Sequence, residues 1–265
     1  MKLVVDQPDF KLYEGDAFIV MRDLIRQRRL FDMIFLDPPF FDWESGSKGD
    51  KKPQHSELSY LTYRLLRPEG SVWLCGTQPQ LANDYRYWRR FFTLNFEIIQ
   101  YKNVGAPAIN RKQWLRVHEN IWCLYRSSTK WSDLKMTVDR LTRKGETKGI
   151  RGKPMRLWGA GKKEWRVNVG YPRSVYPCQK ITKGHREYVG HPTQKPEGLI
   201  RKIVEFSTEP GDWILDPFCG SGTLPAVALP IDRKVVAVEI EPKYVEIIKA
   251  RTKNALKQGR MDKWI

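Results

Sequence analysis

Long apolar runs are missing from this sequence of 265 residues. Its apolar runs, such as residues 34–36 and 235–238, fall far short of the ~20 residues that cross a bilayer. The first residues also lack the basic and apolar pattern of a secretion signal. We therefore expect a soluble, intracellular (cytoplasmic) protein that does not bind membranes. Its length suffices for one large domain or for one domain with an insertion.

Cysteine and histidine are scarce, with four residues of each. Cys75, Cys123, Cys178 and Cys219 form no C-x-x-C pair, so the sequence supports neither a disulfide framework nor a zinc site. The histidines are scattered and form no cluster with metal-ligand spacing. We expect chemistry that needs no metal.

Acidic residues are too few to balance the basic ones, because 47 Lys and Arg face 30 Asp and Glu and leave a net charge of +17. Residues 102–190 hold 21 basic and 6 acidic residues, a net of +15, so the rest of the chain contributes only +2. Tryptophans and tyrosines are interleaved with these basic residues. This mixture suits phosphate neutralisation and base stacking, and it predicts a nucleic-acid partner rather than a membrane surface.

Short apolar runs that end at a turn or an acidic residue predict seven buried strands. They cover residues 10–13, 32–36, 71–75, 96–101, 120–125, 213–215 and 234–238. Helical patterns lie between many of them, at residues 18–29, 57–66, 79–92, 197–205, 223–229 and 242–256. This alternation predicts an α/β fold with a mostly parallel sheet and helices on both faces. Ligands of such folds bind beyond the carboxyl ends of the strands.

Residues 127–190 interrupt the alternation. They hold 16 basic and 5 acidic residues and show no long regular periodicity. Their tryptophans argue against a disordered linker, because disordered chains are poor in aromatic residues. We predict an inserted recognition region here, which divides the catalytic domain into residues 1–126 and residues 191–265.

A glycine-containing loop follows the strand predicted at 213–215 and reads Asp-Pro-Phe-Cys-Gly-Ser-Gly-Thr over residues 216–223. Glycines allow a tight turn and close approach to a ligand, although such a turn can also serve geometry alone. Glu239 ends the next strand about twenty positions on, where these folds place a carboxylate that binds ribose hydroxyls. The loop lacks the lysine of a phosphate-binding G-x-x-x-x-G-K-[ST] motif. The two spaced features predict a nucleotide-like cofactor.

A second loop, Asp37-Pro38-Pro39-Phe40, ends the strand predicted at 32–36. Two prolines fix the backbone and remove two donors, which leaves carbonyls and the Asp37 carboxylate as rigid acceptors beside an aromatic ring. An exocyclic amino group that donates to Asp37 and to the Pro38 carbonyl becomes a better nucleophile, and Phe40 is placed to stack on its ring. A strand that simply stops at Pro-Pro is the alternative.

The order of these motifs resembles that of the amino-methylating DNA methyltransferases in the β arrangement. There, an Asp-Pro-Pro-aromatic motif precedes the recognition region, and the cofactor loop follows it. In this chain Asp37–Phe40 is followed by residues 127–190, by His-Pro-Thr-Gln-Lys-Pro at 191–196 and by the glycine loop. The resemblance covers both ends of the chain and leaves the basic middle unmatched.

The resemblance implies a Rossmann-like fold that binds S-adenosyl-L-methionine and methylates an amino group of a flipped-out base in double-stranded DNA. Asp37, rather than Ser, favours adenine N6. The implied catalytic residues are Asp37, Pro38, Pro39 and Phe40. The implied cofactor contacts are Asp16, Ala17, Thr193, Lys195, Asp216, Phe218, Gly220, Ser221, Gly222, Thr223 and Glu239. We expect DNA contacts from Arg111, Lys112, Arg116, Arg143, Lys144, Arg151, Lys153, Lys162, Lys163 and Arg166.

Several alternatives stay open. Asp16 has the position of a helix cap as well as of a cofactor contact. Methylation of cytosine N4 is one alternative function, because it uses the same amine chemistry. Methylation of RNA or of a protein amide is another, and it is usually associated with Asn-Pro-Pro-Tyr. A third alternative is a DNA-binding protein that keeps this scaffold without catalysis. Cys178 resembles the nucleophile of cytosine C5 methyltransferases, but it lies upstream of the cofactor glycines instead of downstream. A homodimer and a cognate restriction endonuclease are partners that the resemblance leaves open.

Overall fold

The computed structural model describes residues 1–39, 54–106, 116–137 and 173–262. The strands are β1 (Lys2–Asp6), β2 (Phe10–Glu14), β3 (Phe31–Leu36), β4 (Leu66–Gly76), β5 (Phe92–Ala106), β6 (Arg116–Arg126), β7 (Val175–Cys178), β8 (Trp213–Asp216) and β9 (Lys234–Glu239). The helices are α1 (Ala17–Arg26), α2 (His55–Leu65), α3 (Gln78–Trp88), α4 (Glu197–Ser207), α5 (Thr223–Ala228) and α6 (Pro242–Asp262), with short 3-10 turns at η1 (Trp131–Asp133) and η3 (Leu229–Ile231).

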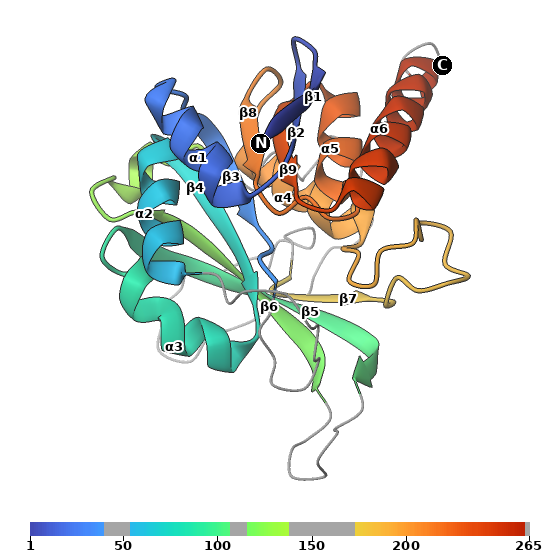
Figure 1. The fold of residues 1–265 in the computed structure, drawn as a ribbon. Helices are drawn as coiled ribbons and strands as arrows, with labels where there is room; N and C mark the ends of the chain where they lie inside the picture. Colours follow the sequence, from blue (N-terminus) through green and yellow to red (C-terminus); the bar gives the residue numbers. More distant parts are fainter. Residues whose placement is uncertain (40–53, 107–115, 138–172, 263–265) are drawn as a thin grey trace, which may run out of the picture.

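Within the described residues, nine strands form one sheet in the order β1-β2-β9-β8-β3-β4-β6-β5-β7 (Figure 1). The five strands from β2 to β4 in this order are parallel to their neighbours. Strands β1 and β6 pair antiparallel with their neighbours, and β7 adds a parallel edge to β5. The sheet is therefore parallel at its centre and mixed at both sides.

Helices cover both faces of the sheet, with α1, α2 and α3 on one face and α4, α5 and α6 on the other (Figure 1). Strand β3 shows why both faces are apolar, because all six of its residues are buried. Met33 and Phe35 pack toward α4 and α5, whereas Ile34 and Leu36 pack toward α1 and α2. Side chains alternate between the faces of a strand, so a strand covered on both sides reads as one continuous apolar run.

The pairing of β3 with β8 determines where the two predicted functional loops meet. These strands are adjacent and parallel, with Met33 opposite Ile214 and Ile34 opposite Leu215. The strand that follows β3 in the sequence, β4, is added on one side of this pair, and the strand that follows β8, β9, is added on the other side. The connections after β3 and β8 therefore lead away from each other. Such a switch point opens a crevice at the carboxyl ends of the strands.

The fold confirms the α/β prediction, and each of the seven predicted strands is present. The prediction missed β1 and β7, so the sheet is wider than expected. Of residues 127–190, the described part includes β7 and a segment in which Lys135 pairs with Asp32 and Asp212. The domain boundaries at 126 and 190 stay predictions. Among the described residues, we find no helix that is both long and apolar enough to cross a membrane.

Candidate active site

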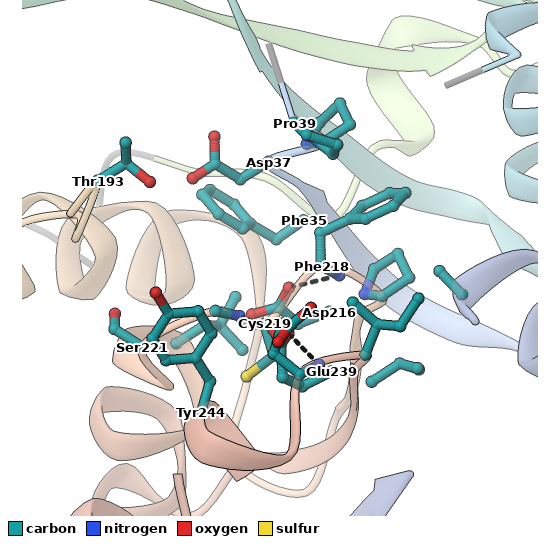
Figure 2. A pocket seen from close by; sticks show the side chains of 18 of the residues that line it. Phe35, Asp37, Pro39, Thr193, Asp216, Phe218, Cys219, Ser221, Glu239 and Tyr244 are labelled. Carbon is teal, nitrogen blue, oxygen red and sulfur yellow. Dashed lines mark hydrogen bonds between the residues drawn. The ribbon is translucent and has the colours of Figure 1, made fainter. Parts of the chain in front are cut away.

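A cavity of about 1270 Å³ opens at the carboxyl edge of the sheet. Its walls come from the loops after β2, β3, β8 and β9, together with residues 191–195 and Glu119 at the start of β6. In Figure 2 Asp37 and Pro39 lie at one end and Glu239 at the other, with Phe218 between them. We call the loop that begins at Asp37 the acceptor loop. It lies about 180 positions before the glycine loop in the sequence, and both loops face the same cavity.

The glycine loop is held in place by the acidic residues at the ends of β8 and β9. Glu239 accepts hydrogen bonds from the amide of Gly220 at 2.7 Å and from the amide of Glu241 at 2.9 Å. Asp216 accepts one from the amide of Phe218 at 3.3 Å. Burial raises the pKa of Glu239, and the backbone amides of Glu241, Gly220 and Ile240 oppose that rise. A carboxylate oxygen has two lone pairs, so Glu239 keeps acceptor capacity toward the cavity.

Arg251 of α6 ties the end of this loop to the body of the protein. Its guanidinium donates to the Ser221 carbonyl at 3.0 Å, to the Thr223 hydroxyl at 3.0 Å and to the Glu197 carboxylate at 2.6 Å. The Thr223 hydroxyl in turn donates to the carbonyl of Lys195 at 3.2 Å. One buried arginine thus fixes the glycine loop relative to α4 and to the segment that carries Lys195.

Two glycines of the loop adopt left-handed backbone conformations, with φ of +52° at Gly220 and +74° at Gly222. A Cβ at Gly220 would lie 3.1 Å from Nε2 of His191. A Cβ at Gly222, which caps α5, would lie 3.0 Å from Cγ1 of Ile248 and 3.3 Å from its Cα. The sequence pattern Gly-x-Gly is therefore required here both by φ and by close packing.

We expect Gly222→Ala to destabilise the protein by about 1–3 kcal/mol, because alanine must adopt a strained φ and push against the backbone of α6. Thermal unfolding should then begin several degrees lower. Gly211→Ala is the matched control, since Gly211 also has a positive φ (+91°) but has no atom within 4 Å of an added Cβ. An equal loss in both variants would show that φ strain alone matters and that contact with Ile248 does not.

The acceptor end of the cavity is built around a buried ion pair. The Lys195 ammonium lies 2.8 and 2.7 Å from the two carboxylate oxygens of Asp37. It also lies 3.4 Å from Oε2 of Glu119, whose other oxygen pairs with Lys102. Asp37 is 158 positions from Lys195 in the sequence, and the parallel pairing of β3 with β8 brings their segments together.

Burial controls the ionisation of these groups. It raises the pKa of Asp37, a rise that Lys195 opposes and Glu119 increases. Burial also opposes ionisation of Glu119, but Lys195 and Lys102 outweigh it and lower that pKa to about 2. Burial and the nearby Asp37 charge raise the pKa of Asp216 to about 8, so Asp216 is largely protonated at neutral pH. Burial and the Lys195 charge lower the pKa of His191 to about 4, so its ring is neutral.

Most predicted site residues lie in the wall of this cavity. They are Asp16, Ala17, Asp37, Pro38, Pro39, Thr193, Lys195, Asp216, Phe218, Gly220, Ser221, Thr223 and Glu239. Gly222 lies behind the wall, and Asp16 also caps α1 by accepting a hydrogen bond from the amide of Ile19 at 3.0 Å. Phe40 and most of the predicted DNA contacts lie outside the described residues, namely Arg111, Lys112, Arg143, Lys144, Arg151, Lys153, Lys162, Lys163 and Arg166. Only the backbone of Arg116 is described, in β6.

Among the cavity residues to which the sequence assigned no role are Glu119, Tyr244 and His191. No pattern in the sequence singled out the carboxylate of Glu119. Tyr244 of α6 packs its ring against His191 at a centroid distance of 4.4 Å. His191 begins the motif at 191–196 and could have been proposed from that position alone. Cys178, by contrast, lies on β7 outside this cavity and accepts a hydrogen bond from Gln100 at 3.4 Å. The described part of the chain holds no cluster of three or more side chains suited to a metal ion.

Known proteins resemble this chain over most of its length. The family model described as DNA methylase matches residues 31–250. The type II methyltransferase M.BglII of Bacillus subtilis is 29% identical over 89% of this chain and 67% of its own length. The DNA adenine methyltransferase YhdJ of Escherichia coli is 26% identical over 89% of this chain and 80% of its own length.

Solved structures share the fold at lower identity. The M1.HpyAVI–SAM complex aligns with a TM-score of 0.61 and 22% identity over 91% of this chain and 99% of its own chain. The cytosine-N4-specific PvuII DNA methyltransferase aligns with a TM-score of 0.65 and 16% identity over 97% of this chain and 95% of its own. These likenesses confirm the Rossmann-like methyltransferase fold.

Proposed function

This chain belongs to the DNA methylase family, and from that premise we propose that it transfers a methyl group from S-adenosyl-L-methionine to the N6 amino group of adenine in double-stranded DNA. The protein is a DNA methyltransferase that uses S-adenosyl-L-methionine. Adenine as its target is supported by the carboxylate of Asp37 and by similarity to a relative named as a DNA adenine methyltransferase. The observation that carries the proposal is the single cavity shared by Asp37 and the glycine loop.

The cavity has the features that the cofactor requires. Its volume of about 1270 Å³ exceeds the ~300–1,000 Å³ of an ordinary small-molecule pocket, which leaves room for a base beside the cofactor. Glu239 would accept hydrogen bonds from the ribose, and Asp16 would contact the adenine end. Phe218, Ser221 and Thr223 would lie along the methionine part, with Thr193 near its carboxylate.

When bound, the cofactor supplies an electrophilic methyl group. The amino nitrogen would form a bond to the methyl carbon while the carbon–sulfur bond breaks, and the electron pair of the broken bond would stay on sulfur. Asp37 accepts a hydrogen bond from the amino group and so fixes the lone pair toward the methyl group. The same carboxylate takes the proton that the nitrogen then releases. Pro38 and Pro39 keep the acceptor rigid, and Phe40 would stack on the base.

A base inside a duplex cannot reach this cavity, so the target must rotate out of the helix. The basic residues of 102–190 would hold the DNA backbone, and residues 127–190 would read its sequence. Cytosine N4 is the second candidate target, because it presents the same kind of amino group. The similarity to enzymes named type II methyltransferases favours a restriction-modification role.

Mass spectrometry of nucleosides tests this function. Unmethylated DNA incubated with the protein and labelled S-adenosyl-L-methionine should yield labelled N6-methyldeoxyadenosine. N4-methyldeoxycytidine in its place would keep the chemistry and correct the base. DNA that shifts in a gel but acquires no label would instead identify a non-catalytic DNA-binding protein. Binding should weaken steeply with added salt in either case.

A further inference from the structure

Four buried or half-buried side chains of alternating charge form a row from the acceptor loop to the antiparallel side of the sheet. Asp37 follows β3, Lys195 precedes α4, Glu119 lies in β6 and Lys102 in β5. Lys195 contacts both oxygens of Asp37 at 2.8 and 2.7 Å and lies 3.4 Å from Oε2 of Glu119. Glu119 pairs with Lys102 through its other oxygen. We call these four residues the charge row.

The charge row resolves a conflict in the acceptor role of Asp37. An ammonium that contacts both carboxylate oxygens favours the ionised form of Asp37, but it also withdraws electron density from the atoms that must accept the amino hydrogen. Lys195 is only 6% exposed in its side chain, so water screens this attraction poorly. With Lys195 as its only neighbour, Asp37 would be a weak acceptor.

We propose that Glu119 is a positioning residue of methyl transfer, which shares the Lys195 ammonium and thereby preserves the acceptor strength of Asp37. The inference rests on the proposed function of the cavity. The amino nitrogen gains positive charge as its bond to the methyl group forms. Lys102 neutralises the charge row as a whole, but at Asp37 the Glu119 charge outweighs that of Lys102. The row therefore favours the charged state of the nitrogen more than an isolated Asp37–Lys195 pair would.

The position of Glu119 follows from the strand pairing. Gly76 at the end of β4 pairs with Asn120, and β6 runs antiparallel to β4, so the start of β6 lies at the same edge as the carboxyl ends of the parallel strands. Glu119 lines the cavity, and its side chain is 15% exposed. Apart from the charge row, Asp216 and Cys75 interact electrostatically with Asp37. Burial raises the pKa of Asp216 to about 8 and that of Cys75 well above its ordinary value, so both are largely neutral near pH 7.

The sign of the Glu119 effect follows from these neighbours. Its negative charge raises the pKa of Asp37, so its removal lowers that pKa and weakens the acceptor. Asp37 must be ionised to accept, and activity is lost as the pH falls through its pKa. Glu119→Gln should therefore move the acid limb of the pH–rate profile about one unit lower and reduce the plateau rate about tenfold, with an unchanged KM for S-adenosyl-L-methionine.

Glu97→Gln provides a matched control on the same hairpin. The Glu97 carboxylate accepts hydrogen bonds from Asn120 at 2.7 Å and from Trp122 at 2.9 Å, and a glutamine oxygen can accept both. This variant should keep the wild-type profile. Glu119→Asp, which retains the charge, should restore most of the rate. Equal losses in Glu119→Asp and Glu119→Gln, or an acid limb that stays in place or rises in Glu119→Gln, would overturn the proposal.

A second measurement does not depend on methyl transfer. The pKa of Asp37 can be followed through the carboxyl resonance of 13C-labelled aspartate, assigned with Asp37→Asn, in the full chain without DNA. The pKa should be lower in Glu119→Gln than in the wild type and unchanged in Glu97→Gln. If the wild type labels no DNA, the proposed function fails, whereas this titration still supports or contradicts the role of Glu119 in setting the basicity of Asp37.

Discussion

Asp37→Ala should reduce the rate of methyl transfer about 10²–10³-fold, the loss typical when a group that acts directly on the reacting atoms is removed. Without the carboxylate, the amino group loses one of its two proposed acceptors and keeps only the Pro38 carbonyl, and the Lys195 ammonium loses its closest acceptor. Single-turnover labelling of DNA measures the effect. Calorimetric titration with S-adenosyl-L-methionine should give an affinity close to that of the wild type, because Glu239 and Ser221, two of the proposed cofactor contacts, lie away from Asp37 (Figure 2).

Asp37→Asn is the conservative comparison. The amide keeps one acceptor oxygen but turns an NH2 group toward the Lys195 ammonium or toward the substrate, so its rate should lie between those of the wild type and Asp37→Ala. An alanine variant that methylates DNA at the wild-type rate would remove Asp37 from the mechanism. An alanine variant that loses cofactor affinity as well would show that Asp37 shapes the whole cavity and not the acceptor end alone.

The central fold could be predicted because buried strands are recognisable in the sequence as short apolar runs. Strand β3 has six buried residues and β9 has five, and both were identified. The strands that were missed lie at the two edges of the sheet. In β1 no residue is fully buried, and β7 is four residues long, contains Pro177 and has exposed or half-buried side chains only. Edge strands bury little apolar surface, so periodicity gives them no clear signal.

The loops that form the site could be predicted from the sequence, but the contacts between their side chains could not. Motif spacing identified the segments that carry Asp37 and Glu239, since each follows a predicted strand, and the family resemblance identified the segment that carries Lys195. The resemblance assigned Lys195 to the cofactor, whereas the structure places its ammonium on Asp37. The order of the strands in the sheet determines such contacts, and no local sequence pattern predicts that β3 lies beside β8. For the same reason Glu119 was not recognised as part of the charge row. Whether Lys195 also contacts the cofactor stays a prediction.

Lys195→Met should have two large effects, because it leaves Asp37 and Glu119 buried without their shared cation. Breaking a buried ion pair from one side costs about 3–5 kcal/mol of stability. Lys195 lowers the pKa of Asp37, so its loss raises that pKa further above the ordinary value of 3.8. A carboxyl group whose pKa is raised in the folded state stabilises the fold at low pH and loses that contribution as the pH rises. The stability deficit of the variant should therefore be largest near pH 7 and shrink in mild acid.

The same substitution shifts activity in the direction opposite to Glu119→Gln. With a higher pKa, Asp37 becomes protonated at a higher pH, so the acid limb of the pH–rate profile should move about 1–3 units upward. Denaturant unfolding at several pH values and single-turnover rates over the same range measure both effects on one preparation. General damage to the cavity would lower the rate at every pH without moving the limb, so that result would contradict the electrostatic role of Lys195. Opposite shifts from two adjacent residues of the charge row would indicate that both act on the same carboxylate.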